Sequence, residues 1–170
     1  QPKPASTSGP IIAYGGGSKA AAERAARLGM MFFPQTTDPM MAVFYDEEAE
    51  RVGNPTGLTM GPSQGAPTTV FLAESLDQGW EQFGPYMLHD AVSYRGWMGK
   101  DNNSASLSQA SSVAELREEN GPYRIVTPKQ AVELIKTYQT LSLQPLCGGV
   151  PPDLAWSSLS LIEKQVLPFC

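Results

Sequence analysis

The stretch from Pro10 to Gly29 constrains the fold of this chain more than any other part of the sequence. The apolar run Ile11–Tyr14 is typical of a strand, and three glycines follow it directly. Ser18 occupies the expected N-cap position of a helix. The alanine-rich segment after it has a high helix propensity and ends at Gly29, in the C′ position. The sequence therefore predicts a strand, a glycine turn and a helix in direct succession.

The glycine turn, Gly15, Gly16 and Gly17 before Ser18, has two interpretations. Strand–turn–helix geometry points main-chain N–H groups at an anion, and glycine leaves the main chain open to a phosphate. The alternative is a plain turn, in which glycine is used because a turn can require positive φ. A glycine-rich loop is weak evidence by itself. The residues alone therefore leave phosphate binding and a simple turn both open.

Composition bounds the class of protein. The chain has 170 residues, 41% of them hydrophobic and 17% charged, which indicates one globular domain. The net charge is −5 and the 12 basic residues are scattered, which argues against nucleic acid as a partner. No apolar run approaches the roughly 18 residues of a membrane span, so no membrane partner is expected. We interpret residues 1–9 as a linker or a truncated N-terminal region, without a leader sequence.

Cysteine and histidine are both scarce. Two cysteines, Cys147 and Cys170, make no disulfide framework, so a reducing cytoplasm is the expected location. His89 is the only histidine. A zinc site or a Ser-His-Asp triad would depend on this one residue, so no metal site is predicted.

The rest of the chain alternates between strand and helix signals. The predicted strands are Ile11–Tyr14, Met30–Phe33, Thr68–Ala73 and Leu141–Leu146, with a brief extended piece at Tyr123–Val126. Helical patterns fall between them and after the last one, which predicts an α/β fold of parallel (β/α) units. A polar excursion at about residues 98–121 interrupts the order, and its part Gly99–Ser111 is predicted to be mobile without ligand.

Four motifs carry a resemblance to a known family. They are GGGS after the first strand, VFLAES followed by GWEQFGPYMLHDAVSY, YRIVTPKQAVELI, and PLCGGVPPDLAW near the end. Together they resemble the bacterial luciferase-like monooxygenases, over residues from about 10 to 168. The resemblance implies the C-terminal half of a TIM (β/α)8 barrel, strands five to eight. It also implies reduced FMN or a deazaflavin as cofactor, without choosing between them.

The resemblance assigns roles to the first glycine loop. Gly16, Gly17 and Ser18 would hold the cofactor phosphate, and Gly15 would set the turn. Sites of a (β/α)8 barrel lie at the C-terminal ends of its strands. The family often carries an Asp-Gly pair where this chain has Gly29-Met30, so the cofactor surroundings there differ from the family pattern.

The second loop, Cys147, Gly148 and Gly149, would face the same barrel mouth. Its alternative is a tight turn before a proline-started helix. For Cys147 a small buried apolar residue is preferred over a nucleophile. His89 is either an ordinary helix residue with satisfied hydrogen bonds or a residue lining the active-site mouth.

The implied function is that of an oxidoreductase or monooxygenase polypeptide that supplies the phosphate site and part of the pocket wall. The first four strands of the barrel are missing from the sequence, so this piece alone is predicted to be inactive. Its expected partners are the N-terminal half of the same barrel or a second copy of itself, in a homo-oligomer, together with a small-molecule substrate. The alternative is a non-catalytic phosphate-binding or assembly module.

Overall fold

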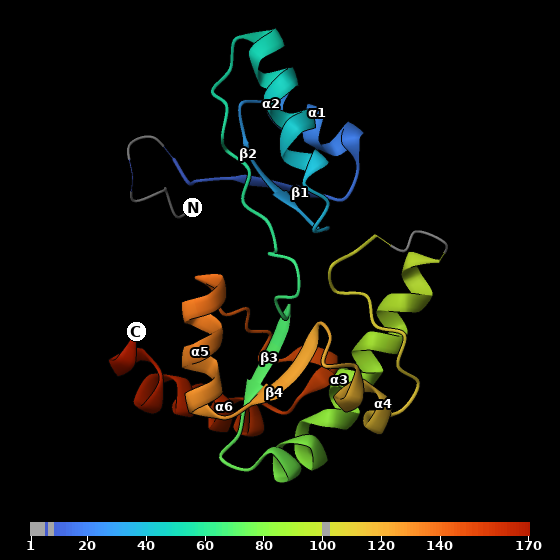
Figure 1. Cartoon of the computed structure of the whole chain (residues 1–170), viewed down its shortest axis with the longest axis vertical. Helices are drawn as coiled ribbons and strands as arrows, with labels where there is room; N and C mark the ends of the chain where they lie inside the picture. Colours follow the sequence, from blue (N-terminus) through green and yellow to red (C-terminus); the bar gives the residue numbers. More distant parts are fainter. Residues whose placement is uncertain (1–5, 7–8, 100–102) are drawn as a thin grey trace, which may run out of the picture. The chain divides into compact units, whose positions relative to one another are not determined.

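The structure is a computed structural model that describes residue 6, residues 9–99 and residues 103–170. Most of the predicted linker at residues 1–9 lies outside the described residues. The chain divides into two compact units, Gln1–Pro62 (unit 1) and Ser63–Cys170 (unit 2), and each is described by itself (Figure 1). No helix in the described ranges is long and apolar enough to cross a membrane.

Unit 1 is a small parallel (β/α) arrangement. Its elements are β1 (Ala13–Gly16), α1 (Lys19–Arg27), β2 (Met31–Pro34) and α2 (Met40–Val52). β1 pairs with β2 in parallel. On its other edge, β2 forms a parallel bridge from Phe32 to Thr59. The three extended segments thus lie side by side in the order in which the chain makes them.

One face of the unit 1 sheet is covered by both helices. The buried cluster there consists of Ala22, Ala25 and Ala26 from α1, Phe32 from β2, and Met41, Tyr45 and Ala49 from α2. The rings of Phe32 and Tyr45 stack with their centroids 6.3 Å apart. Phe33, the next residue of β2, is 44% exposed, and Met60 is 56% exposed. Since successive side chains of a strand point to opposite faces, Phe33 marks a second face that these helices leave open.

Unit 2 is larger and also parallel. Its elements are β3 (Thr69–Leu72), α3 (Leu76–Met98), α4 (Val113–Glu119), β4 (Tyr123–Val126), α5 (Pro128–Tyr138), the 3-10 turn η1 (Cys147–Gly149), α6 (Pro152–Gln165) and the 3-10 turn η2 (Leu167–Phe169). β3 pairs with β4 on one side and forms a single bridge from Val70 to Leu143 on the other. β3 is therefore the central strand of unit 2.

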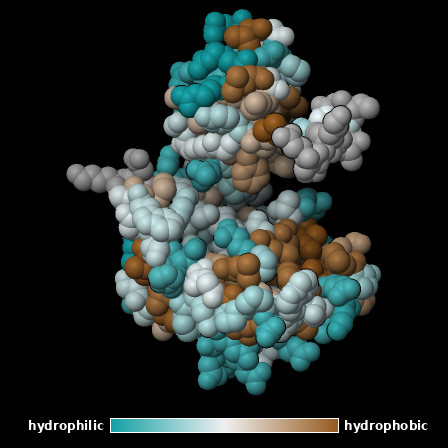
Figure 2. Space-filling view, turned by 180° about the vertical axis from the view of Figure 1, so that it is seen from behind, coloured by the Kyte–Doolittle hydropathy of each residue, from teal (hydrophilic) through white to brown (hydrophobic). Residues whose placement is uncertain are grey.

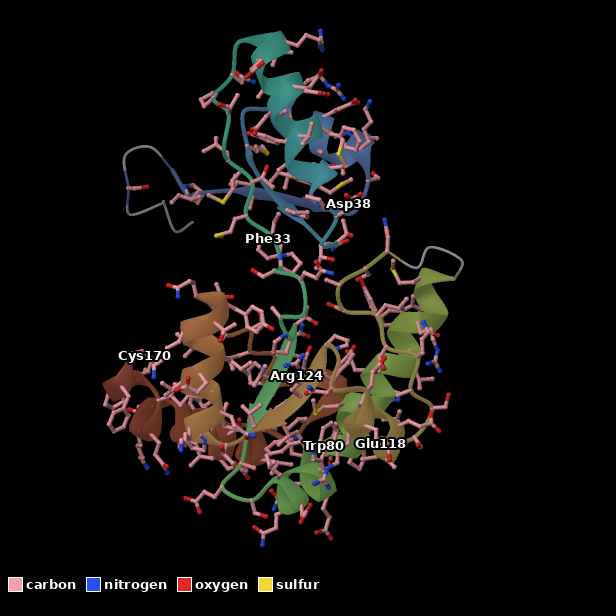
Figure 3. All side chains as sticks on the ribbon, viewed as in Figure 1. Phe33, Asp38, Trp80, Glu118, Arg124 and Cys170 are labelled. Atoms are coloured by element: carbon pink, nitrogen blue, oxygen red, sulfur yellow. The ribbon has the colours of Figure 1, made fainter. Side chains whose placement is uncertain are left out.

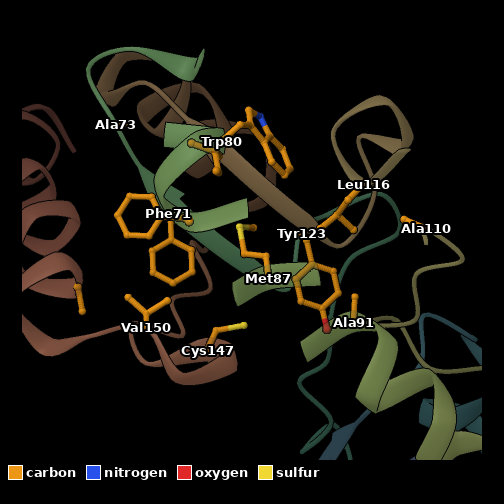
Figure 4. Close-up of a cluster of buried hydrophobic side chains, with 13 residues drawn as sticks. Phe71, Ala73, Trp80, Met87, Ala91, Ala110, Leu116, Tyr123, Cys147 and Val150 are labelled. Atoms are coloured by element: carbon orange, nitrogen blue, oxygen red, sulfur yellow. The ribbon is translucent and has the colours of Figure 1, made fainter. Parts of the chain in front are cut away.

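The two faces of β3 pack against different clusters, and all four of its residues are buried. Phe71 belongs to the cluster with Phe83, Met87, Tyr123 and Cys147, part of which Figure 4 shows. Val70 and Leu72 belong to the cluster with residues of α5 and α6. In Figure 1, α3 and α4 lie on one side of β3 and β4, and α5 and α6 lie on the other.

Several strand boundaries differ from the predicted ones. The first strand begins only at Ala13, and Ile11 and Ile12 before it are exposed. Leu141–Leu146 is not a strand and keeps one bridge at Leu143. The next N–H group of β3 on that side, from Leu72, donates to the Ser158 hydroxyl at 2.7 Å instead of continuing the ladder. The brief extended piece Tyr123–Val126 is instead a strand that pairs with β3 over all four residues.

Parallel (β/α) units are confirmed, but the described strands form two separate two-stranded sheets. Closure into half of a barrel stays a prediction. Thr127 and Gln130 form a capping box at the start of α5. α3 runs without interruption through Pro85.

The excursion at residues 98–121 contains α4, and its residues 100–102 lie outside the described part of the chain. Ser108 is fully buried, and its hydroxyl donates a hydrogen bond to Glu119. The Arg95 guanidinium of α3 donates to the carbonyl oxygens of Ser108 and Ala110, at 3.2 and 2.9 Å. The segment around Ser108 is thus tied to α3 and α4, and the mobility predicted for Gly99–Ser111 stays untested.

Candidate functional site

The first glycine loop connects β1 to α1. Gly15 and Gly16 are the last two residues of β1, paired with Phe33 and Pro34, and neither has positive φ. Gly15 therefore belongs to β1 and does not form the turn, contrary to the role that the resemblance gave it. The bend is made by the two residues after β1, Gly17 and Ser18.

The two strand glycines differ in what surrounds them. A Cβ on Gly16 would lie 2.5 Å from the Cβ of Ala21, so glycine is needed there to let α1 pack close to β1. A Cβ on Gly15 would meet nothing closer than the carbonyl oxygen of Phe33 at 4.0 Å. The requirement at Gly16 is therefore explained by packing, without a ligand.

The N-terminus of α1 has the features of an anion site. The Ser18 hydroxyl accepts a hydrogen bond from Ala21 N–H at 3.3 Å, and the Ser18 carbonyl oxygen accepts from Ala21 and Ala22. The N–H groups of Lys19 and Ala20 come before the first hydrogen bonds of the helix, and the first N–H groups of a helix have no partner within it. The first turn contains no acidic residue. A phosphate group fits this donor set and the positive end of the helix dipole.

The basic side chains of α1 are engaged in other contacts. Arg24 donates to the Tyr14 hydroxyl at 2.8 Å, which raises the pKa of Arg24, and Arg27 donates to Glu48 at 2.8 Å. The Lys19 ammonium lies 3.7 Å from Glu23 and 4.9 Å from the Phe44 ring centroid. The main chain and Ser18 would therefore be the chief ligands of an anion at this loop.

The second glycine loop is the 3-10 turn η1, Cys147–Gly149. Gly148 has φ of +60°, and a Cβ on it would lie 1.9 Å from the main-chain oxygen of Tyr86. Gly149 has φ of +85°, with nothing within 4 Å of its Cβ position. Gly148 thus lets η1 pack directly on α3. This loop belongs to unit 2 and the first loop to unit 1, so their common barrel mouth stays a prediction.

Cys147 is 6% exposed and lies in the cluster with Met87 and Tyr123 (Figure 4). The Tyr123 hydroxyl donates to Asp90 Oδ2 at 2.8 Å. Burial, followed by the nearby Asp90 charge, raises the pKa of the Cys147 thiol to about 12. Burial and the same carboxylate also raise the pKa of Tyr123. A thiol with such a pKa stays protonated at neutral pH and is a poor nucleophile.

His89 is exposed on α3, whereas its neighbour Asp90 is half-buried. Asp90 lines an open cavity of about 450 Å³ together with Gln144, Pro145, Leu146, Cys147 and Gly148. The sequence analysis missed Asp90. A signal was present, because Asp90 falls on the apolar stripe of α3 that includes Phe83, Met87 and Ala91.

Two further cavities lie in unit 2. One of about 220 Å³ lies where β3 leads into α3, beside Ser157 and Leu161 of α6. The other, of about 570 Å³, lies along β4. No group of three or more potential metal-ligating side chains occurs in the described ranges.

The fold was compared with solved structures. The crystal structure of the monooxygenase RslO1 from Streptomyces bottropensis is similar, with a TM-score of 0.55 and 19% identity over 96% of this chain and 49% of that one. A structure of the coenzyme F420 dependent tetrahydromethanopterin reductase from Methanopyrus kandleri gives a TM-score of 0.49 and 12% identity, over 92% and 50% of the two chains. The second likeness is too weak to support a conclusion.

The chain therefore shares its fold with part of the monooxygenase RslO1 and spans about half the length of that protein. No protein-family model matches the sequence, and no curated protein gave a significant match. The likeness to RslO1 concerns the fold alone at this level of identity.

Proposed function

We propose that this chain is part of a flavin- or deazaflavin-dependent oxidoreductase of the luciferase-like class, which carries out monooxygenation with reduced FMN or hydride transfer with a deazaflavin. The observation that carries the proposal is the N-terminus of α1, where Ser18 and the N–H groups of Lys19 and Ala20 follow the glycines of β1. The likeness to RslO1 and the PLCGGVPPDLAW motif support the same class.

In this proposal Gly17, Ser18 and the first turn of α1 bind the cofactor phosphate. The cofactor, when bound, would supply the redox chemistry, as reduced FMN does toward oxygen or a deazaflavin does in hydride transfer. The exposed Gly15 main chain leaves room for a ligand at the end of β1. The protonated Cys147 thiol and the exposed His89 are given no catalytic role, and the catalytic acid or base is assigned to the partner.

The proposed partner is the N-terminal half of the same barrel, or a second copy of this chain in a homo-oligomer. The half-length match to RslO1 supports a missing part of similar size. The small-molecule substrate would bind between the two parts, and the cytoplasm is the proposed location.

The test replaces Ser18 by Asp and titrates the intact chain with FMN, followed by amide chemical shifts. Asp is as good an N-cap as Ser, so α1 should stay folded. Its charge should repel a phosphate, and we expect FMN affinity to fall at least about tenfold, or about 1.4 kcal/mol. Ser112, the N-cap of α4 that accepts from Glu115 N–H, gives the matched control Ser112→Asp.

Equal FMN affinity in wild type and Ser18→Asp would overturn the phosphate site. Gly17→Val is a second variant, expected to weaken FMN binding much more than folding. The alternative function, a non-catalytic phosphate-binding module, predicts the same loss of binding. It differs in predicting no turnover of reduced flavin when the chain is combined with the N-terminal part of its own reading frame.

A further inference from the structure

A groove of about 570 Å³ runs along β4 in unit 2. One wall is formed by α3 and the end of α4, and the other wall by α5. All four residues of β4 line it, together with Leu76, Trp80, Arg117, Asn120, Lys129, Gln130, Glu133, Leu134, Thr137 and Tyr138. Figure 3 labels Trp80 on α3 and Arg124 on β4, one from the wall and one from the floor.

The floor of the β4 groove is an open strand edge. β4 pairs with β3 only, and no other strand in the described part of the chain bonds to it. The carbonyl oxygens of Pro122 and Val126 accept bonds from Thr69 and Ala73, on the β3 side. Main-chain groups alternate in direction along a strand, so Tyr123 and Ile125 point their N–H and C=O groups into the groove. An open edge of this kind is a template for another strand.

The side chains beside this edge are largely apolar. Trp80, Ile125 and Val126 are buried residues that reach the groove, and Leu134 of α5 lines the opposite wall. Parallel strands are normally covered on both faces. Helices lie on both sides of β4, so an added strand would pack between α3 and α5.

The charge of the β4 groove is opposite to that of the whole chain. Arg117 pairs with Asp77 at 2.8 Å, and Glu133 pairs with Lys136 at 2.9 Å. Arg124 donates only to the carbonyl oxygens of Gly121 and Gly65, which carry no net charge. Lys129 is exposed, and neither Lys129 nor Arg124 has a carboxylate within ion-pair distance among the described residues. The groove thus has two uncompensated positive charges in a chain of net charge −5.

We propose that the β4 groove binds an extended, acidic segment of a partner polypeptide, which adds a strand at the free edge of β4. Main-chain hydrogen bonds to Tyr123 and Ile125 would supply affinity, as in other complexes formed by strand addition. Apolar side chains of the segment would face Trp80 and Leu134, and its carboxylates would pair with Arg124 and Lys129. A second copy pairing β4 with β4 is disfavoured, because it would bring Arg124 and Lys129 of both copies together. The proposal does not depend on the cofactor site in unit 1.

The experiment selects a random displayed peptide library on the immobilised intact chain at low salt. We expect enriched peptides that alternate apolar and polar residues and carry Asp or Glu. Binding of a selected peptide should slow amide hydrogen exchange at Tyr123 and Ile125. Lys129→Glu should weaken peptide binding at least about tenfold, whereas the control Lys164→Glu, at an exposed position of α6, should change the affinity less than about twofold.

Three results would overturn the proposal. One is the absence of enrichment over the bare support, or enrichment of peptides without carboxylates. Another is protection from exchange that lies away from Tyr123 and Ile125. The third is a chain that dimerises at micromolar concentration with these two amides already protected, which would assign the edge to a second copy. The circular dichroism spectrum of Lys129→Glu must match that of wild type. Lys129→Gln removes the charge without reversing it and is expected to weaken binding less than Lys129→Glu, which distinguishes an effect of charge from one of side-chain packing.

Discussion

Unit 1 and unit 2 are both built from parallel strands that alternate with helices, yet they bury their sheets differently. In unit 1 both helices pack against Phe32 on one face, and Phe33 on the other face is 44% exposed. In unit 2 the central strand β3 is buried on both faces, with Phe71 in one cluster and Val70 in the other. Both units also carry exposed apolar side chains, as Figure 2 shows.

The difference follows from the order in which the strands are added. In unit 1 the chain proceeds in one direction, from β1 to β2 to Thr59, and right-handed crossovers then place every helix on the same face. In unit 2 the chain goes from β3 to β4 and then back across β3 to Leu143. Reversing the direction places α5 on the face opposite α3. Unit 1 therefore has its helices on one face, as in a segment of a (β/α)8 barrel, whereas unit 2 has helices on both faces of β3.

The largest effect is expected when the two units are separated at the boundary between Pro62 and Ser63. The fragment 63–170 should unfold cooperatively by itself, because its sheet is enclosed on both faces. The fragment 1–62 should show no cooperative transition, since a sheet covered on one face by so short a chain buries too little apolar surface. Circular dichroism melts of both fragments test this. A cooperative melt of 1–62 would remove the proposed difference between the units.

The next effect is a matched pair of core substitutions in the intact chain. Phe71 is 1% exposed and stacks on Phe83 at a centroid distance of 4.5 Å, so Phe71→Ala should cost about 3–5 kcal/mol. Phe33→Ala should cost about 1 kcal/mol or less, because its side chain is already half in solvent. Urea unfolding gives both values. Similar losses for the two variants would show that the Phe33 face is covered in the intact chain.

The sequence predicts the elements of this fold better than their pairing. Strand–glycine–helix in unit 1 and the Thr127–Gln130 capping box in unit 2 are local signals, and local residues decide them. The partners of β3 are not a local property. Tyr123–Val126 pairs with β3 over four residues on one side, whereas Leu141–Leu146 on the other side keeps one bridge, because the Leu72 N–H donates to Ser158 of α6.

The candidate site shows the same limit. The sequence predicts the N-cap at Ser18, which the structure has. It does not distinguish a glycine needed for packing from one needed for a ligand. Gly16 faces Ala21, and Gly148 faces Tyr86, which is distant in sequence. Asp90 was missed because its partner, Tyr123, is brought beside α3 only by the tertiary fold.

A smaller effect separates the two glycines of η1. Gly148→Ala combines left-handed strain with a Cβ 1.9 Å from the Tyr86 oxygen, so η1 would have to move away from α3. Gly149→Ala carries only the strain of its φ of +85°. We expect Gly148→Ala to lose about 2 kcal/mol more than Gly149→Ala. Tryptophan fluorescence during urea unfolding is a suitable probe, since Trp80, Trp97 and Trp156 all lie in unit 2. An equal loss would mean that η1 does not pack on Tyr86 in solution.

The smallest effect is a dependence of unit 1 on pH that unit 2 should lack. Glu48 of α2 is a buried residue that accepts hydrogen bonds from Arg51 at 2.6 and 2.7 Å and from Arg27 of α1 at 2.8 Å. Arg51, and then Arg27, lowers the pKa of Glu48 from its ordinary value of 4.5 to about 2. Because the folded state has the lower pKa, the stabilisation is complete above pH 4.5 and is lost as the pH falls toward 2.

Glu48→Gln should therefore unfold at lower urea than wild type near pH 6, and this gap should narrow as the pH falls below 4.5 toward 2. Far-ultraviolet circular dichroism follows both units, and tryptophan fluorescence follows unit 2 alone. The control is Glu133→Gln, which removes an exposed pair with Lys136 in unit 2 and should change neither midpoint measurably. A gap for Glu48→Gln that stayed constant from pH 6 to pH 2 would mean that the Glu48 carboxylate is not held by Arg27 and Arg51. A matching shift in the tryptophan transition would mean that the two units unfold as one.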